Sequence, residues 1–502
     1  MSDNRNDINS LVIFPAFEVG YSELLHFLKS MEKNNLLNRF LLICPADFLN
    51  VHQFQVPYHI DDDFKSHAGL VRKIEAWAKL NRRTFIGIIG VDEEEQFNLS
   101  KRIARRFKLP FYHDRTCSTA SNKYLLKTAF KEHGVLTGDF ALLTGFDNTD
   151  IERVGFPFPN VLKVLSGNGS QYLFRNENID QLKENYRILK TAVRGIKGDP
   201  RFRKQHVIIN NQAVTLNPRR QFLLEAFITG EEFSCDFVIC DGMVQVVRVV
   251  RKIKGSYFGY FKGYHLLNEK ELGQYNIDLP RLKGLCERIA RALAIETGQT
   301  GVSGVCGVCM VDFKVMNGEW YVLEASIRPG LSAFNHLMYE VYGYTSLFLM
   351  ARQRLGMAID IRFPQENGAV VYLYAQPGKK GEKIQSFDSP VLESLKKTFE
   401  IVHIHIYEEV GGGAVDLVTD HSALLRGYVI LKNIDGEKLE ELAELINKSF
   451  VGSRGTSRVF QKSPWLPEAL INMNNIQQEL TDICGERIDN TDPDYFKEAI
   501  DS

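Results

Sequence analysis

Apolar runs in the first part of the chain alternate with segments whose apolar residues recur at helical spacing. The strand-like runs lie at 10–17, 39–48 and 83–91, and the amphipathic stretches between them lie at 21–33 and 68–80. This alternation is typical of a small parallel sheet covered by helices. It predicts an N-terminal α/β domain that ends near residue 115.

The rest of the chain shows a different mixture of patterns. Residues 116–360 combine helical periodicity with β-rich segments, whereas strand-like runs in residues 361–462 surround the acidic helical stretch 437–450. We therefore expect a central mixed domain and a closing α+β domain. Residues 463–502 are polar and compatible with a helix, so they are expected to be peripheral.

Composition and charge narrow the class of protein. The 502 residues are 44% hydrophobic and 25% charged, as in a globular protein, and this length favours about three domains. The 61 Lys and Arg nearly cancel the 62 Asp and Glu, so the formal net charge of -1 favours neither nucleic acid nor a membrane as partner. The polar start, the lack of a long apolar run and eight scattered cysteines predict a cytoplasmic protein with reduced thiols.

The first candidate for chemistry is a strand followed by a loop of small residues. Lys163 interrupts the apolar run of this strand, and the loop that follows lacks bulky side chains. Its residues are Ser166, Gly167, Asn168, Gly169 and Ser170. Such a loop can turn backbone N–H groups toward an anion, and a lysine beside it adds a positive charge. A phosphate site is therefore predicted, with a plain hairpin connection as the alternative.

A second candidate lies at the end of the next apolar run. Glu225 would be costly to bury without a donor, such as an adenine amino group or a lysine. Ala226, Phe227 and Ile228 could then offer backbone groups to the edge of the ring, and Glu232 could accept from ribose hydroxyls. The alternative is that both carboxylates simply face water.

A third candidate is a hairpin that carries two acids. Asn317 and Gly318 form a strong turn signal, and Asp312 and Glu324 stand at the same distance from Gly318 on facing strands. Two adjacent carboxylates repel each other unless a cation lies between them, and Mg²⁺ prefers such oxygen ligands. Arg328 follows closely enough to hold a phosphoryl group or an oxyanion. This pattern predicts a Mg²⁺ site, with solvent-exposed acids as the alternative.

Several other features are interpreted as structural. The basic stretch of Arg248, Arg251, Lys252 and Lys254 could hold a substrate carboxylate, but an alternating strand turns some of these side chains to solvent, which is the favoured interpretation. No second cysteine pair matches Cys306 and Cys309, which favours buried thiols over a zinc site.

Two further features lie near the C-terminus of the chain. His403 and His405 alternate on a strand and, without a third ligand nearby in the sequence, are interpreted as a structural pair. The glycines at 411–413 are expected to form a tight turn or a close backbone approach.

The order of these motifs resembles that of the ATP-grasp superfamily, especially its carboxylate–amine ligases that join amino acids or dipeptides. The resemblance covers about half of the chain and adds Lys123 as a counterpart of the family's first lysine. It implies an ATP-grasp fold, α/β and α+β, in which two α+β subdomains within 116–360 hold ATP between them. A parallel α/β (pre-ATP-grasp) domain over 1–115 would precede them, and an α+β domain over 361–462 would follow.

The resemblance also implies a role for each matching residue. Lys123 and Lys163 would contact phosphates beneath the loop, Arg328 would act in catalysis, and Mg²⁺ would be the metal, with Mn²⁺ as the alternative. The family's last motif has Asn where this chain has Ser326, so Ser326 is a doubtful metal ligand beside Asp312 and Glu324. The nucleotide contacts implied are Lys123, Lys163, Ser166, Gly167, Gly169, Ser170, Glu225, Ala226, Phe227, Ile228 and Glu232.

These expectations combine into one predicted reaction. ATP would activate a carboxylate as an acyl phosphate, and an amine, expected to belong to an amino acid or small peptide, would displace the phosphate. A bicarbonate-dependent carboxylase and a non-catalytic ATP-binding subunit remain the alternatives, and a homodimer is left open.

Overall fold

The computed structural model describes most of the chain up to residue 450. The described residues are 10–16, 19–45, 48, 54–91, 98–144, 148–167, 170–196, 198–209, 212–240, 243–255, 258–295, 307–331, 333–359, 361, 363–374, 395–397, 399–406 and 425–450. Gly169, Cys306, the glycines at 411–413 and the segment 463–502 lie outside them. The predictions made for these residues therefore stay predictions. Among the described residues, no helix is both long and apolar enough to cross a membrane.

The N-terminal part of the chain forms a four-stranded parallel sheet in the order β3-β2-β1-β4. Its elements are β1 (Ser10–Pro15), α1 (Tyr21–Lys33), η2 (Leu37–Arg39), β2 (Phe40–Cys44), β3 (His59–Asp61), α3 (His67–Asn81), β4 (Thr84–Ile88) and α4 (Asn98–Phe107). Val12 and Phe14 pack toward α1, whereas Leu11 and Ile13 pack toward α3 and α4. Both faces of β1 are covered, which explains why its residues after Ser10 are all apolar. The predicted parallel α/β arrangement is confirmed.

A second, antiparallel sheet of four strands has the order β5-β10-β6-β7. Its core lies against α8, where Leu182, Tyr186 and Leu189 pack on Leu162 and Leu224 of the sheet. The elements of this region are α5 (Asp114–Ala120), α6 (Lys123–Glu132), β5 (Phe140–Leu143), α7 (Asn148–Val154), β6 (Asn160–Val164), β7 (Leu173–Asn176), α8 (Ile179–Gly195), η3 (Pro200–Phe202), β8 (Gln205–Ile209), β9 (Gln212–Leu216) and β10 (Phe222–Ala226).

The largest element is an eight-stranded antiparallel sheet with the order β15-β14-β11-β12-β13-β16-β18-β17. One part of it packs on α10 and α6 through Leu282, Leu285, Ile289, Leu126 and Phe130. Its elements are β11 (Glu231–Cys240), β12 (Met243–Lys254), β13 (Phe261–Leu266), α9 (Glu269–Gln274), α10 (Leu279–Ala292), β14 (Gly307–Met316), β15 (Glu319–Ser326), α11 (Phe334–Tyr342) and α12 (Ser346–Arg354).

The C-terminal strands continue this same sheet. β16 (Gly368–Tyr374) pairs with β13, β18 (Leu425–Lys432) pairs with β16, and β17 (Glu400–Ile406) forms the edge. α14 (Leu439–Phe450) covers these strands. The predicted mixture of strands and an acidic helix is therefore present, while the domain boundaries stay predictions.

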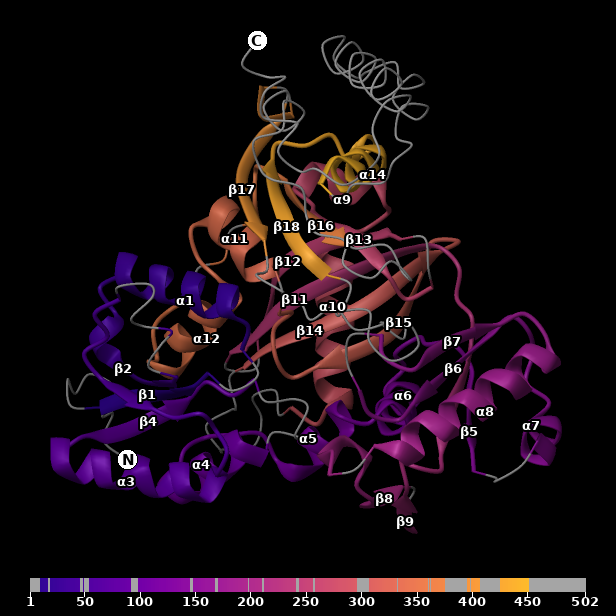
Figure 1. The fold of residues 1–502 in the computed structure, drawn as a ribbon, viewed down its shortest axis with the longest axis horizontal. Coiled ribbons are helices and arrows are strands. Elements are labelled where there is room, and N and C mark those ends of the chain that lie inside the picture. The colour runs from indigo at the N-terminus through magenta and orange to yellow at the C-terminus, as the bar shows by residue number, and fades with distance from the viewer. Residues whose placement is uncertain are drawn as a thin grey trace, which may run out of the picture.

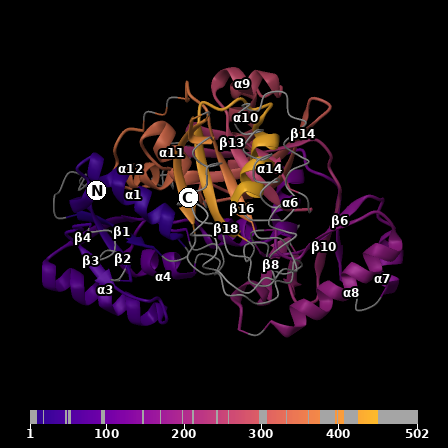
Figure 2. The same ribbon diagram turned by 45° about the horizontal axis from the view of Figure 1, so that its top comes forward.

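Figures 1 and 2 show how the three larger sheets are arranged. The parallel N-terminal sheet lies on one side of the eight-stranded sheet, and the small antiparallel sheet with α7 and α8 lies on the other. The connection from β10 to β11 is short: only four residues separate Ala226 from Glu231. This connection joins the small antiparallel sheet to the large one, and a cavity lies beside it.

Candidate active site

A cavity of about 500 Å³ lies between the small antiparallel sheet and the large sheet. Most of the predicted site residues line it, although they come from six different elements and two connections. Those that line it are Lys123, Lys163, Gly167, Ser170, Glu225, Ala226, Phe227, Ile228, Glu232, Asp312 and Glu324. Ser166, Ser326 and Arg328 are not among the lining residues. The fold thus brings together residues that are up to about 200 positions apart in the sequence.

On the small-sheet wall, Glu225 lies between two lysines. Its Oε1 is 2.8 Å from Lys163 Nζ and 3.6 Å from Lys127 Nζ. Burial raises the pKa of Glu225, but Lys127 and Lys163 lower it more, so its pKa lies below the usual value. Of the two donors considered from the sequence, a lysine is therefore the one present, and Glu225 does not simply face water.

Lys127 was not predicted from the sequence. It lies one helical turn after Lys123 on α6, and its fully buried Nζ donates to Thr137 Oγ1 (2.5 Å) and to the Val322 carbonyl (3.2 Å). Burial lowers its pKa to about 8, although Glu225 opposes this change. The i, i+4 spacing from Lys123 is the sequence signal that could have revealed it, because such residues share one helix face.

Lys123 connects the loop after β6 with the large sheet. Asn122 caps α6 by accepting from the Tyr124 and Leu125 N–H groups, which places Lys123 at the first position of the helix. The Lys123 Nζ donates to the Gly167 carbonyl at 2.5 Å and lies 3.8 Å from Glu324 Oε2. The lysine added by the family resemblance thus lines the cavity, between the loop and Glu324.

The loop itself is shaped by two residues with positive φ. Gly167 has a φ of +150° and Ser170 a φ of +58°, and the buried Ser166 Oγ has no hydrogen-bond partner among the described residues. Asn168 and Gly169 lie outside the described residues, so the predicted phosphate cradle is only partly visible.

The connection between the two sheets carries the predicted adenine contacts. The Ala226 and Phe227 N–H groups already donate to the carbonyls of Asp139 and Pro159, and the Ile228 carbonyl accepts from Lys314 Nζ at 2.9 Å. Within the described part of the chain, the Ile228 N–H makes no hydrogen bond. Of the three backbone N–H groups in this segment, that of Ile228 therefore remains available to a ligand.

Gly230 ends this connection and needs to be glycine. Its φ is +99°, and a Cβ at this position would lie 2.1 Å from the Val315 carbonyl oxygen. The close approach brings the start of β11, and with it Glu232, against β14.

On the large-sheet wall, Lys252 lies between two carboxylates. Its Nζ is 2.5 Å from Asp312 Oδ2 and 2.9 Å from Glu232 Oε1. Burial lowers the pKa of Lys252, but Asp312 and Glu232 raise it well above its usual value. Lys314 adds a second amine, 3.7 Å from Glu232 Oε2.

The predicted hairpin pairs the two acids as expected. β14 and β15 meet at Asn317 and Gly318, both with positive φ, and Asp312 is the direct partner of Glu324 across the strands. Burial raises the pKa of Asp312 to about 6, a rise that Lys252 opposes and Glu324 supports. Partial burial also raises the pKa of Glu324, but Lys123, with other lysines, lowers it more.

The hairpin offers a donor set that fits Mg²⁺. Asp312 Oδ1 and Ser326 Oγ are buried oxygens without a hydrogen-bond partner among the described residues, and Glu324 stands beside both. Unpaired oxygen atoms next to a second carboxylate are the ligands that a hard cation prefers. The oxygen chemistry therefore fits a divalent cation, while the assignment of each ligand stays a prediction.

The basic stretch on β12, interpreted from the sequence as turning some of its side chains to solvent, turns only one of them there. Only Lys254 is exposed, whereas Arg248, Arg251 and Lys252 are buried. Each buried cation has a carboxylate partner on another element, and Arg248 forms a fully buried pair with Asp236 at 2.8 Å. Every residue of β12 from Val247 to Ile253 is buried, so both faces of this part of the strand are covered and alternation does not turn every second residue to water.

The same buried pair supports the segment that carries Arg328. Asp236 Oδ1 accepts from the Gly330 N–H at 3.0 Å, and its Oδ2 accepts from Ser346 Oγ at 2.8 Å. Arg328 itself donates to the Pro329 carbonyl at 2.8 Å. Asp236 thus fixes the backbone just after Arg328, a role that no local sequence signal indicates.

Comparison with known proteins reaches only the level of the fold. No protein-family model matches the chain, and neither does any curated protein sequence. Among solved structures, an L-amino acid ligase from Bacillus licheniformis matches with a TM-score of 0.64 and 16% identity, covering 88% of this chain and 98% of that one.

Two other solved structures have different activities. An N5-carboxyaminoimidazole synthase from Aspergillus clavatus, in complex with ADP and 5-aminoimidazole ribonucleotide, matches with a TM-score of 0.56 and 14% identity, over 88% of this chain and 98% of that one. A biotin carboxylase from Campylobacter jejuni matches with a TM-score of 0.57 and 15% identity, over 89% and 92%. The chain has the ATP-grasp fold of these enzymes, so the predicted fold is confirmed.

Proposed function

We propose that this protein is an ATP-dependent carboxylate–amine ligase, which forms an amide or peptide bond through an acyl phosphate. The observation that supports this most is one cavity lined by Lys123 and Lys163 on one side and by the paired carboxylates of Asp312 and Glu324 on the other. Triphosphate anions and a divalent cation together match such a pair of walls.

The nucleotide is assigned to the cavity with its adenine ring beside the connection between β10 and β11 and its phosphates near the lysines. The Ile228 N–H would donate to the adenine ring, Glu232 would accept from ribose hydroxyls, and Lys123 and Lys163 would bind phosphate oxygens. Asp312 and Glu324 would hold Mg²⁺, with Ser326 as the doubtful further ligand. The bound ion would neutralise charge on the phosphoryl oxygens.

The proposed reaction has two steps. A substrate carboxylate oxygen attacks the γ-phosphorus, the new O–P bond forms as the bond to the β-phosphate oxygen breaks, and ADP leaves. An amine then attacks the acyl carbon, loses a proton and expels inorganic phosphate. Arg328, close to the end of β15, is assigned to the substrate carboxylate or the developing oxyanion.

The test is turnover with pooled substrates. The full chain, ATP, Mg²⁺ and a pool of amino acids should release phosphate and give a ligated product detectable by mass. Glu324→Ala should reduce turnover by about a hundredfold or more. Glu319→Ala, an exposed position on the same strand, should leave it unchanged.

Other outcomes would replace the proposal. Bicarbonate-dependent turnover without amino acids would identify a carboxylase, an activity named for one solved structure of this fold. Tight ATP binding without turnover under any of these conditions would identify a non-catalytic ATP-binding subunit.

A further inference from the structure

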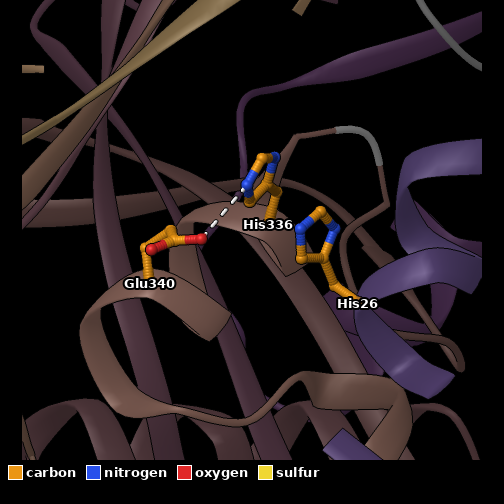
Figure 3. Close-up of side chains that lie close together, drawn as sticks. All are labelled: His26, His336 and Glu340. Carbon is orange, nitrogen blue, oxygen red and sulfur yellow. Dashed lines mark ion pairs between the residues drawn. The ribbon is translucent and has the colours of Figure 1, made fainter. Parts of the chain in front are cut away.

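A second group of chemically reactive side chains lies outside the cavity. His26 comes from α1, the helix that packs on the N-terminal sheet. His336 and Glu340 come from α11, about 300 residues later in the sequence. Figure 3 shows the two imidazole rings facing each other, with the Glu340 carboxylate reaching the His336 ring. One ligand atom from each of the three residues lies within 4.8 Å of the others.

The two imidazoles are buried and closely apposed. His26 is 2% exposed and His336 is 1% exposed, and their ring centroids are 3.6 Å apart. The Glu340 side chain is 28% exposed, and its Oε1 lies 3.4 Å from His336 Nε2. The group therefore lies at the junction of two helices, with access to solvent on the carboxylate side.

Hydrogen bonds engage the Nδ1 atom of each ring. His26 Nδ1 donates to the Ser22 carbonyl at 2.7 Å, and His336 Nδ1 lies 3.0 Å from the Tyr428 hydroxyl, which is 2.6 Å from Ser22 Oγ. Among the described residues, His26 Nε2 has no hydrogen-bond partner. A metal-binding histidine usually has this arrangement, in which one ring nitrogen is bonded to a carbonyl or hydroxyl and the other is left for the ion.

Burial favours the neutral form of both rings. Burial lowers the pKa of His26 to about 3 and that of His336 to about 2, and each is lowered further by a neighbouring histidine. Lys29 also lowers both pKa values, so the group faces one lysine as well as the Glu340 carboxylate. Neutral imidazoles are the form that binds metal ions.

We propose that His26, His336 and Glu340 form a site for a divalent transition-metal ion, with Zn²⁺ as the best match. Two imidazoles and one carboxylate are the ligand set that Zn²⁺ accepts, whereas Mg²⁺ prefers oxygen ligands alone. Among the described residues, His403 on β17 is a further imidazole close to the group, with its ring centroid 4.3 Å from that of His336. It can complete the set, or water can fill the fourth position.

The position of this site indicates what the ion does. A bound ion joins α1 of the N-terminal sheet to α11, and through His403 to the edge of the large sheet. α1 and α11 lie side by side in both views of the ribbon (Figures 1 and 2). Because the ion would join elements that are far apart in the sequence, we assign it a structural role. An ion that binds only the folded chain raises the stability of the chain as the ion concentration rises.

Metal binding to the full chain tests the proposal. The chain is stripped with a chelator and titrated with Zn²⁺ against a chromogenic competitor, and Co²⁺ is used to record the ligand-field spectrum. We expect one tight site per chain, a spectrum typical of mixed nitrogen and oxygen ligands, and a melting temperature that rises with Zn²⁺. His26→Gln and His336→Gln should each weaken binding by at least about tenfold.

Matched variants separate this site from other histidines and from the cavity. His206→Gln, at an exposed histidine that contacts Thr215, and Asp312→Asn in the cavity should leave Zn²⁺ affinity unchanged. If a histidine variant does not fold, as judged by circular dichroism, the partly exposed Glu340→Gln replaces it. Absence of Zn²⁺ binding to the unmodified chain at micromolar concentration, or unchanged binding in the folded variants, would overturn the proposal.

Discussion

On each side of the cavity, one central charged group lies between two groups of opposite charge. On the small-sheet side, Lys127 and Lys163 flank the carboxylate of Glu225, whereas on the large-sheet side Asp312 and Glu232 flank the amine of Lys252. Each central group keeps its charge because its two partners outweigh the cost of burial. On the large-sheet side, Lys254 and Lys314 also line the cavity and balance its carboxylates, whereas the small-sheet side keeps more lysine than carboxylate.

This contrast explains how one cavity can suit both an anion and a cation. Lys123 and Lys163 suit phosphate oxygens, and the adjacent carboxylates of Asp312 and Glu324 suit the metal that accompanies them. Lys123 bridges the two walls, since it lies 3.8 Å from Glu324. Because the walls belong to different sheets, a change on either one can be tested while the other stays intact.

The largest effect is expected from Lys252→Met. This change leaves Asp312 and Glu232 buried without the cation between them, so the free energy of unfolding should fall by about 3–5 kcal/mol. Urea denaturation measures the loss. Lys254→Met on the same strand, where the side chain is 53% exposed, should change stability by no more than about 0.5 kcal/mol.

A second substitution checks the cause of that effect. Adding Asp312→Asn to Lys252→Met removes one of the two unpaired charges and should restore part of the stability. A loss below about 1 kcal/mol for Lys252→Met alone would contradict a lysine held between two buried carboxylates.

A smaller effect is expected on the opposite wall. Lys163→Met should weaken ATP binding by about tenfold to a hundredfold, because a charged hydrogen bond contributes about 1.5–3 kcal/mol. The effect should persist without Mg²⁺, since this wall is assigned to phosphates rather than to the metal. Calorimetric titration measures it, with the exposed Lys204→Met as control. Equal affinities in all three proteins would remove Lys163 from the site.

The smallest effect is a pH dependence of stability from Lys127. Its pKa in the folded chain is about 8, below the usual 10.5, so the unfolded chain binds more protons between these values. Lys127 therefore makes the folded state more stable as pH rises from about 8, by on the order of 1 kcal/mol up to pH 9.5. Lys127→Met should lack this rise, as urea denaturation at several pH values would reveal. Parallel pH curves for both proteins would contradict the buried amine.

The sequence predicted the features that depend on neighbouring residues. Asn317 and Gly318 set the turn, and counting outward from it placed Asp312 opposite Glu324. The parallel N-terminal sheet followed in the same way from alternating apolar and amphipathic segments. In these cases the local sequence pattern is enough to predict the turn, the strand register and the type of sheet.

The sequence could not predict contacts between distant elements. Lys252 seemed free to face solvent because its partners, Asp312 and Glu232, lie on other strands of the sheet. His403 and His405 were interpreted without a further ligand nearby, because His26 and His336 approach only in the folded chain. Such contacts depend on strand order and helix packing, which a single sequence does not specify.

The most direct test of the central proposal follows an oxygen atom. The full chain is incubated with ATP, Mg²⁺ and pooled amino acids whose carboxylates carry a heavy oxygen isotope, and the released phosphate is analysed by mass spectrometry. Attack by a substrate carboxylate predicts one heavy oxygen in each phosphate, together with an amide product. Phosphate that carries only oxygen from ATP and unlabelled water would contradict the acyl-phosphate mechanism.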